Sequence, residues 1–296
     1  MKLFRNLVLL SICLIAVSCK SYQNLSIADK DEVDLVQYSS TSLNPKTRIA
    51  RTAFEKNLPG ELPLPSPENV VLSRILKDYG AVFVARAGAV LPPKIMFESQ
   101  EDCAIWQEQV PKQQANFGVN IELQKPAMQA LLDARREANA NGFNFTARGT
   151  WAGKRDYKDT VKIWLSRLNP GLNYWVQRKK LSAADAERIR SLKPAAQVEE
   201  ILRLEERGIY FSKDFSKSVV YSATPPGCSQ HLSLLAVDIN ENSNKAVRSV
   251  LAKHGWFQTV VSDSPHFTFL GVAETELPSL GLRKVIKDNR SYWIPE

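Results

Sequence analysis

All three histidines of the chain lie in its C-terminal third, and two of them, His231 and His266, each have a carboxylate nearby in a strand-rich part. Asp238 follows His231 by seven residues, and Asp263 precedes His266 by three. Two imidazoles and a carboxylate suit a catalytic zinc ion, because three protein ligands leave a fourth position for water. A further carboxylate beside them could take a proton from that water. We therefore predict one zinc ion held by His231, Asp238 and His266, with Asp263 as general base.

The surroundings of Asp238 favour a metal. Segment 234–239 is otherwise apolar, and a carboxylate buried there is costly unless it is paired or bound to a cation. The simpler alternative is that Asp238 ends a strand and caps a turn, and that the histidines are structural. His254 fits a structural role, because it precedes Gly255 in the last turn of a predicted helix, where the helix dipole favours a positive charge.

Three short motifs in this region resemble the core of the zinc D,D-peptidases of bacterial cell walls; they are Ser229-x-His231, Ala236-x-Asp238 and acid-x-x-His266. That family includes the vancomycin-resistance D,D-carboxypeptidases and dipeptidases. The resemblance covers about 126–271 and implies a hedgehog/DD-peptidase-like fold. It also implies cleavage of D-alanyl peptide bonds in peptidoglycan stem peptides, with the metal ligands and the acid named above.

The resemblance extends upstream to 142–148, where Gly-Phe-Asn-Phe-Thr-Ala-Arg is similar to the family's strand and its substrate-facing arginine. It implies that Arg148 stabilises the developing oxyanion or orients the substrate. The motif is one residue short here, so Arg155 is the alternative. The resemblance further implies that Ser229 binds the substrate or supports a metal ligand.

Three positions depart from the family pattern. Leu234 stands where the family has glycine, Asp263 replaces its glutamate, and Pro265 replaces its tryptophan. The shorter carboxylate bears on turnover, because a displacement of about 1 Å can cost on the order of a hundredfold in rate. The alternative is therefore a non-catalytic peptidoglycan-binding or structural lipoprotein with a degenerate peptidase site. A zinc amidase or endopeptidase is a third hypothesis, and the motifs do not separate carboxypeptidase from dipeptidase or endopeptidase.

The N-terminus has the pattern of an export signal. Lys2 and Arg5 precede an apolar run over 7–17, which is short for a membrane span. The run ends in Ala-Val-Ser-Cys, which resembles the lipobox of bacterial lipoproteins. We predict a lipoprotein signal peptide over 1–18 and lipidation of Cys19, which would anchor the chain to a membrane of the cell envelope, facing the periplasm or the exterior. A plain secretory signal is the alternative.

The remaining chain divides into a tether and one domain. Residues 19–65 are rich in Ser, Asn, Asp, Lys and Pro, which is typical of a linker, and 66–296 is long enough for a single core. The composition, with 24% charged and 44% hydrophobic residues, is typical of a globular protein. The net charge of +8 is not concentrated in basic runs, so we expect no nucleic-acid partner. Nothing in the sequence indicates the oligomeric state.

Caps and periodicity predict helices over 66–80, 99–106, 126–141 and 244–254, with a helical insert over 156–208. Short apolar runs predict strands over 82–85, 143–146, 219–221, 234–239, 257–261 and 266–270. Helices followed by antiparallel strands indicate an α+β fold, a small antiparallel sheet with flanking helices. We expect Trp151 near the substrate groove, and the pair Cys103 and Cys228 could form a disulfide in an oxidising compartment.

Overall fold

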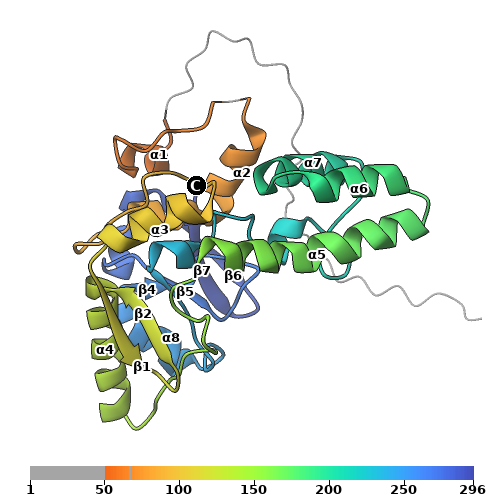
Figure 1. Cartoon of the computed structure of the whole chain (residues 1–296). Helices are drawn as coiled ribbons and strands as arrows, with labels where there is room; N and C mark the ends of the chain where they lie inside the picture. Colours follow the sequence, from red (N-terminus) through yellow and green to blue (C-terminus); the bar gives the residue numbers. More distant parts are fainter. Residues whose placement is uncertain (1–50, 67) are drawn as a thin grey trace, which may run out of the picture. The chain divides into compact units, whose positions relative to one another are not determined.

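The computed structural model describes residues 51–66 and 68–296 (Figure 1). The predictions made for the signal peptide 1–18, for Cys19 and for the tether up to residue 50 lie outside these residues. The α-helices are α1 Ala53–Asn57, α2 Val70–Tyr79, α3 Gln100–Gln109, α4 Lys125–Ala140, α5 Tyr157–Gln177, α6 Ala183–Ser191, α7 Pro194–Glu206 and α8 Lys245–Lys253. The strands are β1 Lys112–Asn116, β2 Asn120–Gln124, β3 Ala236–Asp238, β4 Trp256–Phe257, β5 His266–Phe269, β6 Leu282–Lys287 and β7 Arg290–Pro295.

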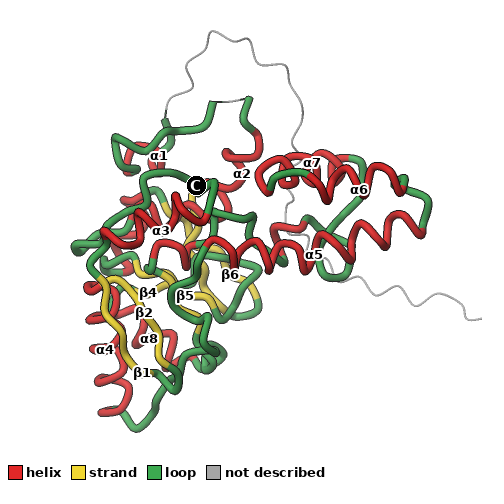
Figure 2. Tube along the Cα trace, in the orientation of Figure 1, coloured by secondary structure: helices red, strands yellow, loops and turns green. Residues whose placement is uncertain are grey.

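A three-stranded antiparallel sheet of order β3-β5-β4 lies at the centre of the fold. In its register Asp238 is opposite His266, and Trp256 is opposite Phe269. The predicted strand-turn-strand arrangement of 257–270 is confirmed, although β4 is only two residues long. The predicted α+β class is also confirmed, since helices surround small antiparallel sheets (Figure 2).

Two further hairpins were absent from the sequence-based prediction: β1 pairs with β2, and β6 pairs with β7. The first packs against α4, and the second packs against α2. The Trp293 N–H donates to the Gln258 carbonyl at 2.8 Å, which ties β7 to the segment after β4. Gln258 in turn donates from its side chain to the Ser264 carbonyl in the turn 262–265. The hairpin β6-β7 is therefore connected through Gln258 to the turn that precedes β5.

The predicted helices are confirmed where their caps were recognised. Ser99 caps α3, Asn244 caps α8, and Asp156 forms a capping box with Asp159 at the start of α5. The predicted insert corresponds to α5, α6 and α7, with α6 packed against both of the others. Figure 1 shows α6 and α7 beside the far part of α5, away from the central strands.

Three predicted strands were wrong. Segments 82–85 and 219–221 lie in 3-10 helices, η1 (Gly80–Val84) and η2 (Val219–Tyr221), and 143–146 is irregular, with only a bridge between Ala147 and Ile239 nearby. A short apolar run that is buried on all sides fits a strand or a helical turn equally well. The predicted helix 66–80 starts later, at Val70, where Asn69 is the N-cap.

The predicted tether was wrong over 51–65. Thr52 and Glu55 form a capping box at α1, and Phe54 is only 3% exposed. Leu58 and Leu62 are buried as well. A Cβ atom added at Gly281 would lie 2.0 Å from the Phe54 backbone nitrogen, so this segment is packed tightly against the chain before β6. The folded unit therefore includes these residues.

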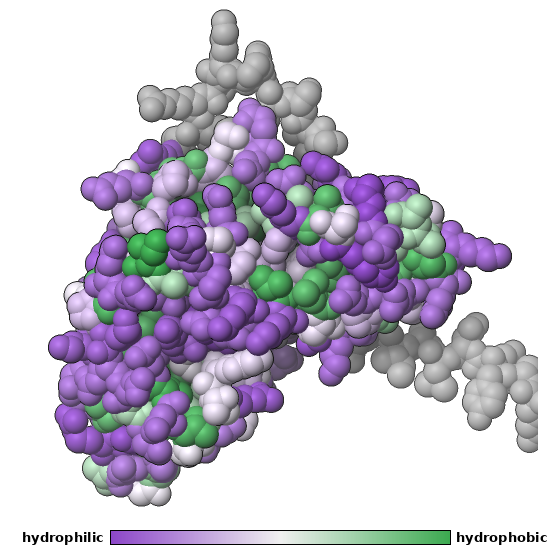
Figure 3. All heavy atoms as spheres, viewed as in Figure 1, coloured by the Kyte–Doolittle hydropathy of each residue, from purple (hydrophilic) through white to green (hydrophobic). Residues whose placement is uncertain are grey.

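The described residues form one main hydrophobic core and a smaller one around Trp106. Cys103 belongs to the smaller core and Cys228 to the main one, and both are free thiols, so the predicted option of a disulfide is not realised. Hydrophilic residues dominate the face drawn in Figure 3, with hydrophobic residues in scattered patches. Among the described helices, none is both long enough and apolar enough to cross a membrane.

Candidate metal centre

The structure brings His231, Asp238 and His266 together in the interior. His231 lies in the 3-10 helix η3 (Gln230–Ser233), Asp238 ends β3, and His266 begins β5. The His231 Nε2 atom is 3.1 Å from His266 Nδ1, and Asp238 Oδ1 is 3.2 Å and 3.3 Å from these two nitrogens. A tetrahedral zinc site with bonds of about 2.0–2.1 Å has ligand atoms about 3.3 Å apart. The three atoms therefore match one face of such a tetrahedron.

Asp238 supplies a direct test of whether a cation fits. Its Oδ2 atom accepts a hydrogen bond from Arg155 Nη2 at 2.7 Å, but its Oδ1 atom is buried without a hydrogen-bond partner among the described residues. A buried carboxylate oxygen without a partner is costly. Because this oxygen faces two imidazole nitrogens, a bound cation would compensate for that cost. The residues present thus fit a metal ion, as the sequence predicted.

In His231 and His266, the ring nitrogen that points away from Asp238 forms a hydrogen bond with another group. His231 Nδ1 lies 2.7 Å from the Gly153 carbonyl oxygen, and His266 Nε2 lies 2.8 Å from Gln230 Oε1. Both partners are acceptors, so both nitrogens carry hydrogen and the opposite nitrogens keep a lone pair for a metal. Burial, followed by the charge of Arg155, lowers the pKa of His231 to about 4, although Asp238 opposes this shift. His231 is therefore neutral at pH 7, as a metal ligand must be.

The two carboxyl groups differ in their environments. Burial raises the pKa of Asp238, but the adjacent His231 and His266 outweigh it and hold that pKa well below its ordinary value. Burial among the surrounding residues raises the pKa of Asp263, and the charge of Asp238 adds to this, while His266, Arg155 and Arg148 oppose it. Although its carboxyl is packed among these groups, Asp263 as a whole residue is exposed at the turn, and its main-chain carbonyl accepts the His266 N–H. One carboxylate is thus fixed in the ion site and the other faces solvent beside it.

Both candidate arginines are close to Asp238, but in different ways. The Arg148 main-chain N–H donates to the Asp238 carbonyl at 2.8 Å, and the Arg148 side chain is exposed. The Arg155 guanidinium contacts the Asp238 carboxylate, and its Nε donates to the Trp151 carbonyl at 3.0 Å. Trp151 itself is 46% exposed, and the Lys162 amine lies 6.0 Å from the centre of its ring. The Arg155 side chain therefore contacts the candidate metal centre, whereas the Arg148 side chain is exposed.

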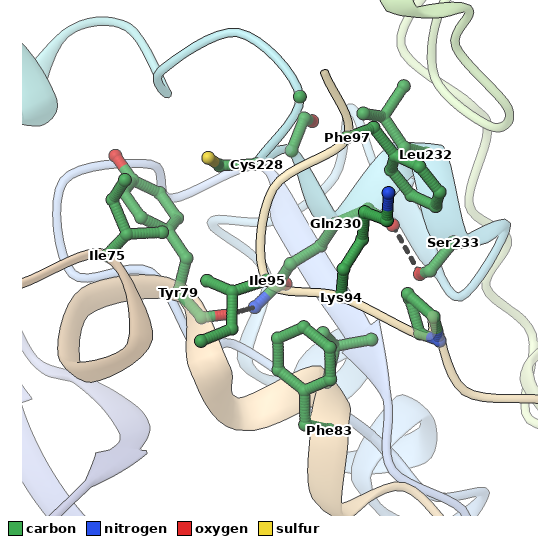
Figure 4. Close-up of a pocket in the computed structure, with 14 residues that line it drawn as sticks. Ile75, Tyr79, Phe83, Lys94, Ile95, Phe97, Cys228, Gln230, Leu232 and Ser233 are labelled. Carbon is green, nitrogen blue, oxygen red and sulfur yellow. Dashed lines mark hydrogen bonds between the residues drawn. The ribbon is translucent and has the colours of Figure 1, made fainter. Parts of the chain in front are cut away.

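The remaining predicted residues lie as follows. Ser229 is buried and lines a small cavity of about 20 Å³ beside η3 (Figure 4), so its contact with a substrate stays a prediction. Leu234, at the position of the family's glycine, has a left-handed backbone with a φ of 58°. His254 Nε2 is 2.9 Å from Glu137 Oε2 and links the end of α8 to α4, away from the other two histidines, in keeping with the predicted structural role.

Sequence reasoning missed two groups that support the histidines, the Gly153 carbonyl and Gln230. A backbone carbonyl carries no signal in a sequence. Gln230 had one: it is a long polar residue directly before a candidate ligand, and once buried such a side chain must find hydrogen-bond partners.

No family model matches the chain, and no curated protein matches it. Among solved structures the chain is similar to a mutant of the vancomycin resistance D,D-pentapeptidase VanY in complex with Zn(II), with 15% identity, a TM-score of 0.33, and coverage of 55% of this chain and 82% of VanY. It is similar to VanYB in complex with D-alanine-D-alanine, with 15% identity, a TM-score of 0.34, and coverage of 55% and 80%. It is also similar to the LD-carboxypeptidase LdcB, with 16% identity, a TM-score of 0.31, and coverage of 53% and 64%. At these values, the function of this chain has to be inferred from its own residues.

Proposed function

We propose that this chain is a zinc-dependent peptidase that cleaves D-alanyl peptide bonds of peptidoglycan stem peptides, in the manner of a D-alanyl-D-alanine carboxypeptidase. The observation that supports it most is the triangle of His231, Asp238 and His266, whose atoms lie 3.1–3.3 Å apart around an unpartnered carboxylate oxygen. The substrate class rests on the resemblance of the motifs around these residues to the zinc D,D-peptidases.

In this proposal the chain's own groups divide the work of hydrolysis between them. Zinc bound by the triangle would polarise the scissile carbonyl and lower the pKa of a water molecule to about 7. Asp263 accepts a proton from the attacking water and passes it to the leaving amine. Its raised pKa makes it a stronger base than an ordinary aspartate. Arg148, exposed beside Asp238, offers a positive charge to the oxyanion or to the substrate carboxylate.

The proposed substrate agrees with the proposed location. A lipid on Cys19 would hold the chain at a membrane of the cell envelope, where peptidoglycan is accessible. The polar residues between Cys19 and the folded unit would then act as the tether.

The proposal is tested by measuring zinc content and the release of D-alanine from a stem pentapeptide ending in D-Ala-D-Ala. The full chain is compared with two site variants and one control variant. We expect about one zinc per chain and D-alanine release for the wild type, zinc without release for Asp263→Asn, and neither for His231→Ala. Asp288→Asn, an exposed change in the β6-β7 turn, is the matched control and should behave like the wild type.

Two outcomes would contradict the proposal. A folded wild type that takes up no zinc would exclude the metallopeptidase. A wild type that binds zinc and the pentapeptide but releases no D-alanine, with Asp263→Asn behaving identically, would favour the non-catalytic wall-binding protein.

A further inference from the structure

Gln230 directly precedes one histidine of the triangle, but its side chain contacts the other. It is 3% exposed, and its Oε1 atom lies 2.8 Å from His266 Nε2. The same oxygen accepts hydrogen bonds from the hydroxyls of Thr268 and Thr259. Its Nε2 atom donates to the Tyr79 carbonyl at 2.8 Å, a bond drawn in Figure 4. Every polar atom of this buried amide thus has a partner.

The contact with Tyr79 determines which way the amide faces. A backbone carbonyl can only accept a hydrogen bond, so the Gln230 nitrogen must point to Tyr79 and its oxygen must point to His266. That oxygen can only accept, so His266 Nε2 must carry the ring proton. His266 Nδ1 then keeps its lone pair, 3.1 Å from His231 Nε2 and 3.3 Å from Asp238 Oδ1.

The amide itself is held on both sides. The Ser233 hydroxyl donates to the Gln230 carbonyl, and the Tyr79 hydroxyl donates to the Val220 carbonyl. Both the glutamine and its partner Tyr79 are therefore fixed before any ligand arrives. Fixed partners of metal-binding histidines raise metal affinity because they orient the ring and select its tautomer.

We propose that Gln230 is a positioning residue of this centre: it fixes His266 in the tautomer that presents Nδ1 to a metal, and it touches neither the metal nor the substrate. The functional meaning of this inference rests on the proposed zinc function. The hydrogen bonds from which it is argued are formed by the chain itself and do not depend on a metal.

The test measures the affinity of the full chain for Zn²⁺ by competition with a chromophoric chelator. Gln230→Met has a similar length but neither accepts nor donates, and we expect its affinity to fall about 10- to 100-fold. Gln230→Glu keeps the acceptor for His266 and loses the donor to Tyr79, so it should stay near the wild type. Gln197→Met is the matched control, because Gln197 of α7 is equally buried but its amide donates to backbone carbonyls of α6, away from the histidines.

The outcomes separate the alternatives. Wild-type affinity in Gln230→Met would overturn the proposal. Equal losses in Gln230→Met and Gln230→Glu would also overturn it, because the bond to Tyr79 and not the acceptor for His266 would then be what matters. A loss in Gln230→Met alone supports it.

A second measurement needs no variant to fold. Nitrogen-15 NMR of the metal-free wild type reports the tautomer of each of the three histidines, assigned through their own backbone resonances. We expect the proton on Nε2 in His266 and on Nδ1 in His231. A proton on Nδ1 of His266 would overturn the inference. If the wild type binds no zinc, the proposed function fails, while this measurement still decides the role of Gln230.

Discussion

Asp238 and His266 face each other across the antiparallel pair β3 and β5, with Asp238 Oδ1 3.3 Å from His266 Nδ1. Two ligands of the candidate metal centre are therefore placed by a strand register. Only His231 has to be brought in from outside the sheet, and η3 does so directly before β3. A register shift of one residue would point the Asp238 side chain to the other face of the sheet, so the central sheet and the centre must form together.

Arg155→Met should weaken zinc binding. The Arg155 guanidinium occupies Asp238 Oδ2, which leaves Oδ1 directed at the two imidazoles. Without it the carboxylate can rotate, and we expect the affinity for Zn²⁺ to fall about 10- to 100-fold, as for other partners of metal ligands. Arg148→Met is the control, since its side chain is exposed and only its backbone contacts Asp238; it should alter peptide hydrolysis and leave zinc affinity unchanged. Titration with a competing chelator distinguishes the two, and equal zinc affinity in both variants would contradict the role of Arg155.

The sequence predicted that the three candidate ligands lie together, as the structure shows, but it did not predict the residues that support them. His231, Asp238 and His266 belong to a pattern of chemically distinctive residues in one apolar region. Arg155 and the Gly153 carbonyl reach the site from a loop that is distant in sequence, and only the folded chain places them there. The two arginine candidates illustrate the limit, because spacing left both open and the geometry assigned them different contacts.

At Leu234 we expect the glycine variant to be more stable than the alanine variant, the reverse of the usual order. Its φ of 58° costs about 1–2 kcal/mol in a non-glycine residue, and its side chain is fully buried. Leu234→Ala keeps the strained backbone and loses the packing, so we expect a loss of about 3 kcal/mol in the free energy of unfolding. Leu234→Gly loses the same packing but relieves the strain, and it should be about 1 kcal/mol more stable than Leu234→Ala. Denaturant unfolding of both variants measures the difference, and an alanine variant that is the more stable of the two would refute the explanation.

The fold was predictable where side chains cap helices, as at Ser99 and Asp156, because capping is a local interaction. The hairpin β1-β2 was missed because β1 contains four polar residues and only one apolar residue, which gives no apolar alternation. Segment 82–85 was predicted as a strand, although 82–84 belong to the 3-10 helix η1, because burial on all sides hides the helical period. In both cases tertiary packing, which the local sequence does not encode, decides the structure.

The metal-free protein should lose stability as the pH falls from about 6.5 to about 4. In the unfolded chain His231 has its ordinary pKa of 6.5, whereas burial and Arg155 lower the pKa to about 4 in the folded chain. Between these values the unfolded state takes up a proton that the folded state refuses, so the free energy of unfolding decreases with falling pH. The stabilisation is complete above pH 6.5 and lost through pH 4. Protonation of Asp238 affects stability only below this pH range, since the pKa of its carboxyl is held well below 3.8.

Urea unfolding of the metal-free chain at several pH values checks this, with His231→Gln as the comparison. The wild type should show the steeper decline between pH 6.5 and pH 4, and added zinc should reduce the decline at the upper end of that range by binding the neutral imidazole. Parallel pH dependences in the wild type and His231→Gln would contradict the assignment to His231.

Phe54→Ala should destabilise the folded unit strongly, although it lies in a stretch whose composition is typical of a linker. Phe54 is 3% exposed, and its ring is within 3.4 Å of the position that a Cβ atom at Gly80 would take. Removing a buried phenylalanine side chain costs about 3–5 kcal/mol. Val70→Ala is the control, because Val70 is 64% exposed and should change stability by about 0.5 kcal/mol or less. Denaturant unfolding compares the two variants. If they unfolded at the same denaturant concentration, α1 would be peripheral and the folded unit would begin after it, as the sequence alone predicted.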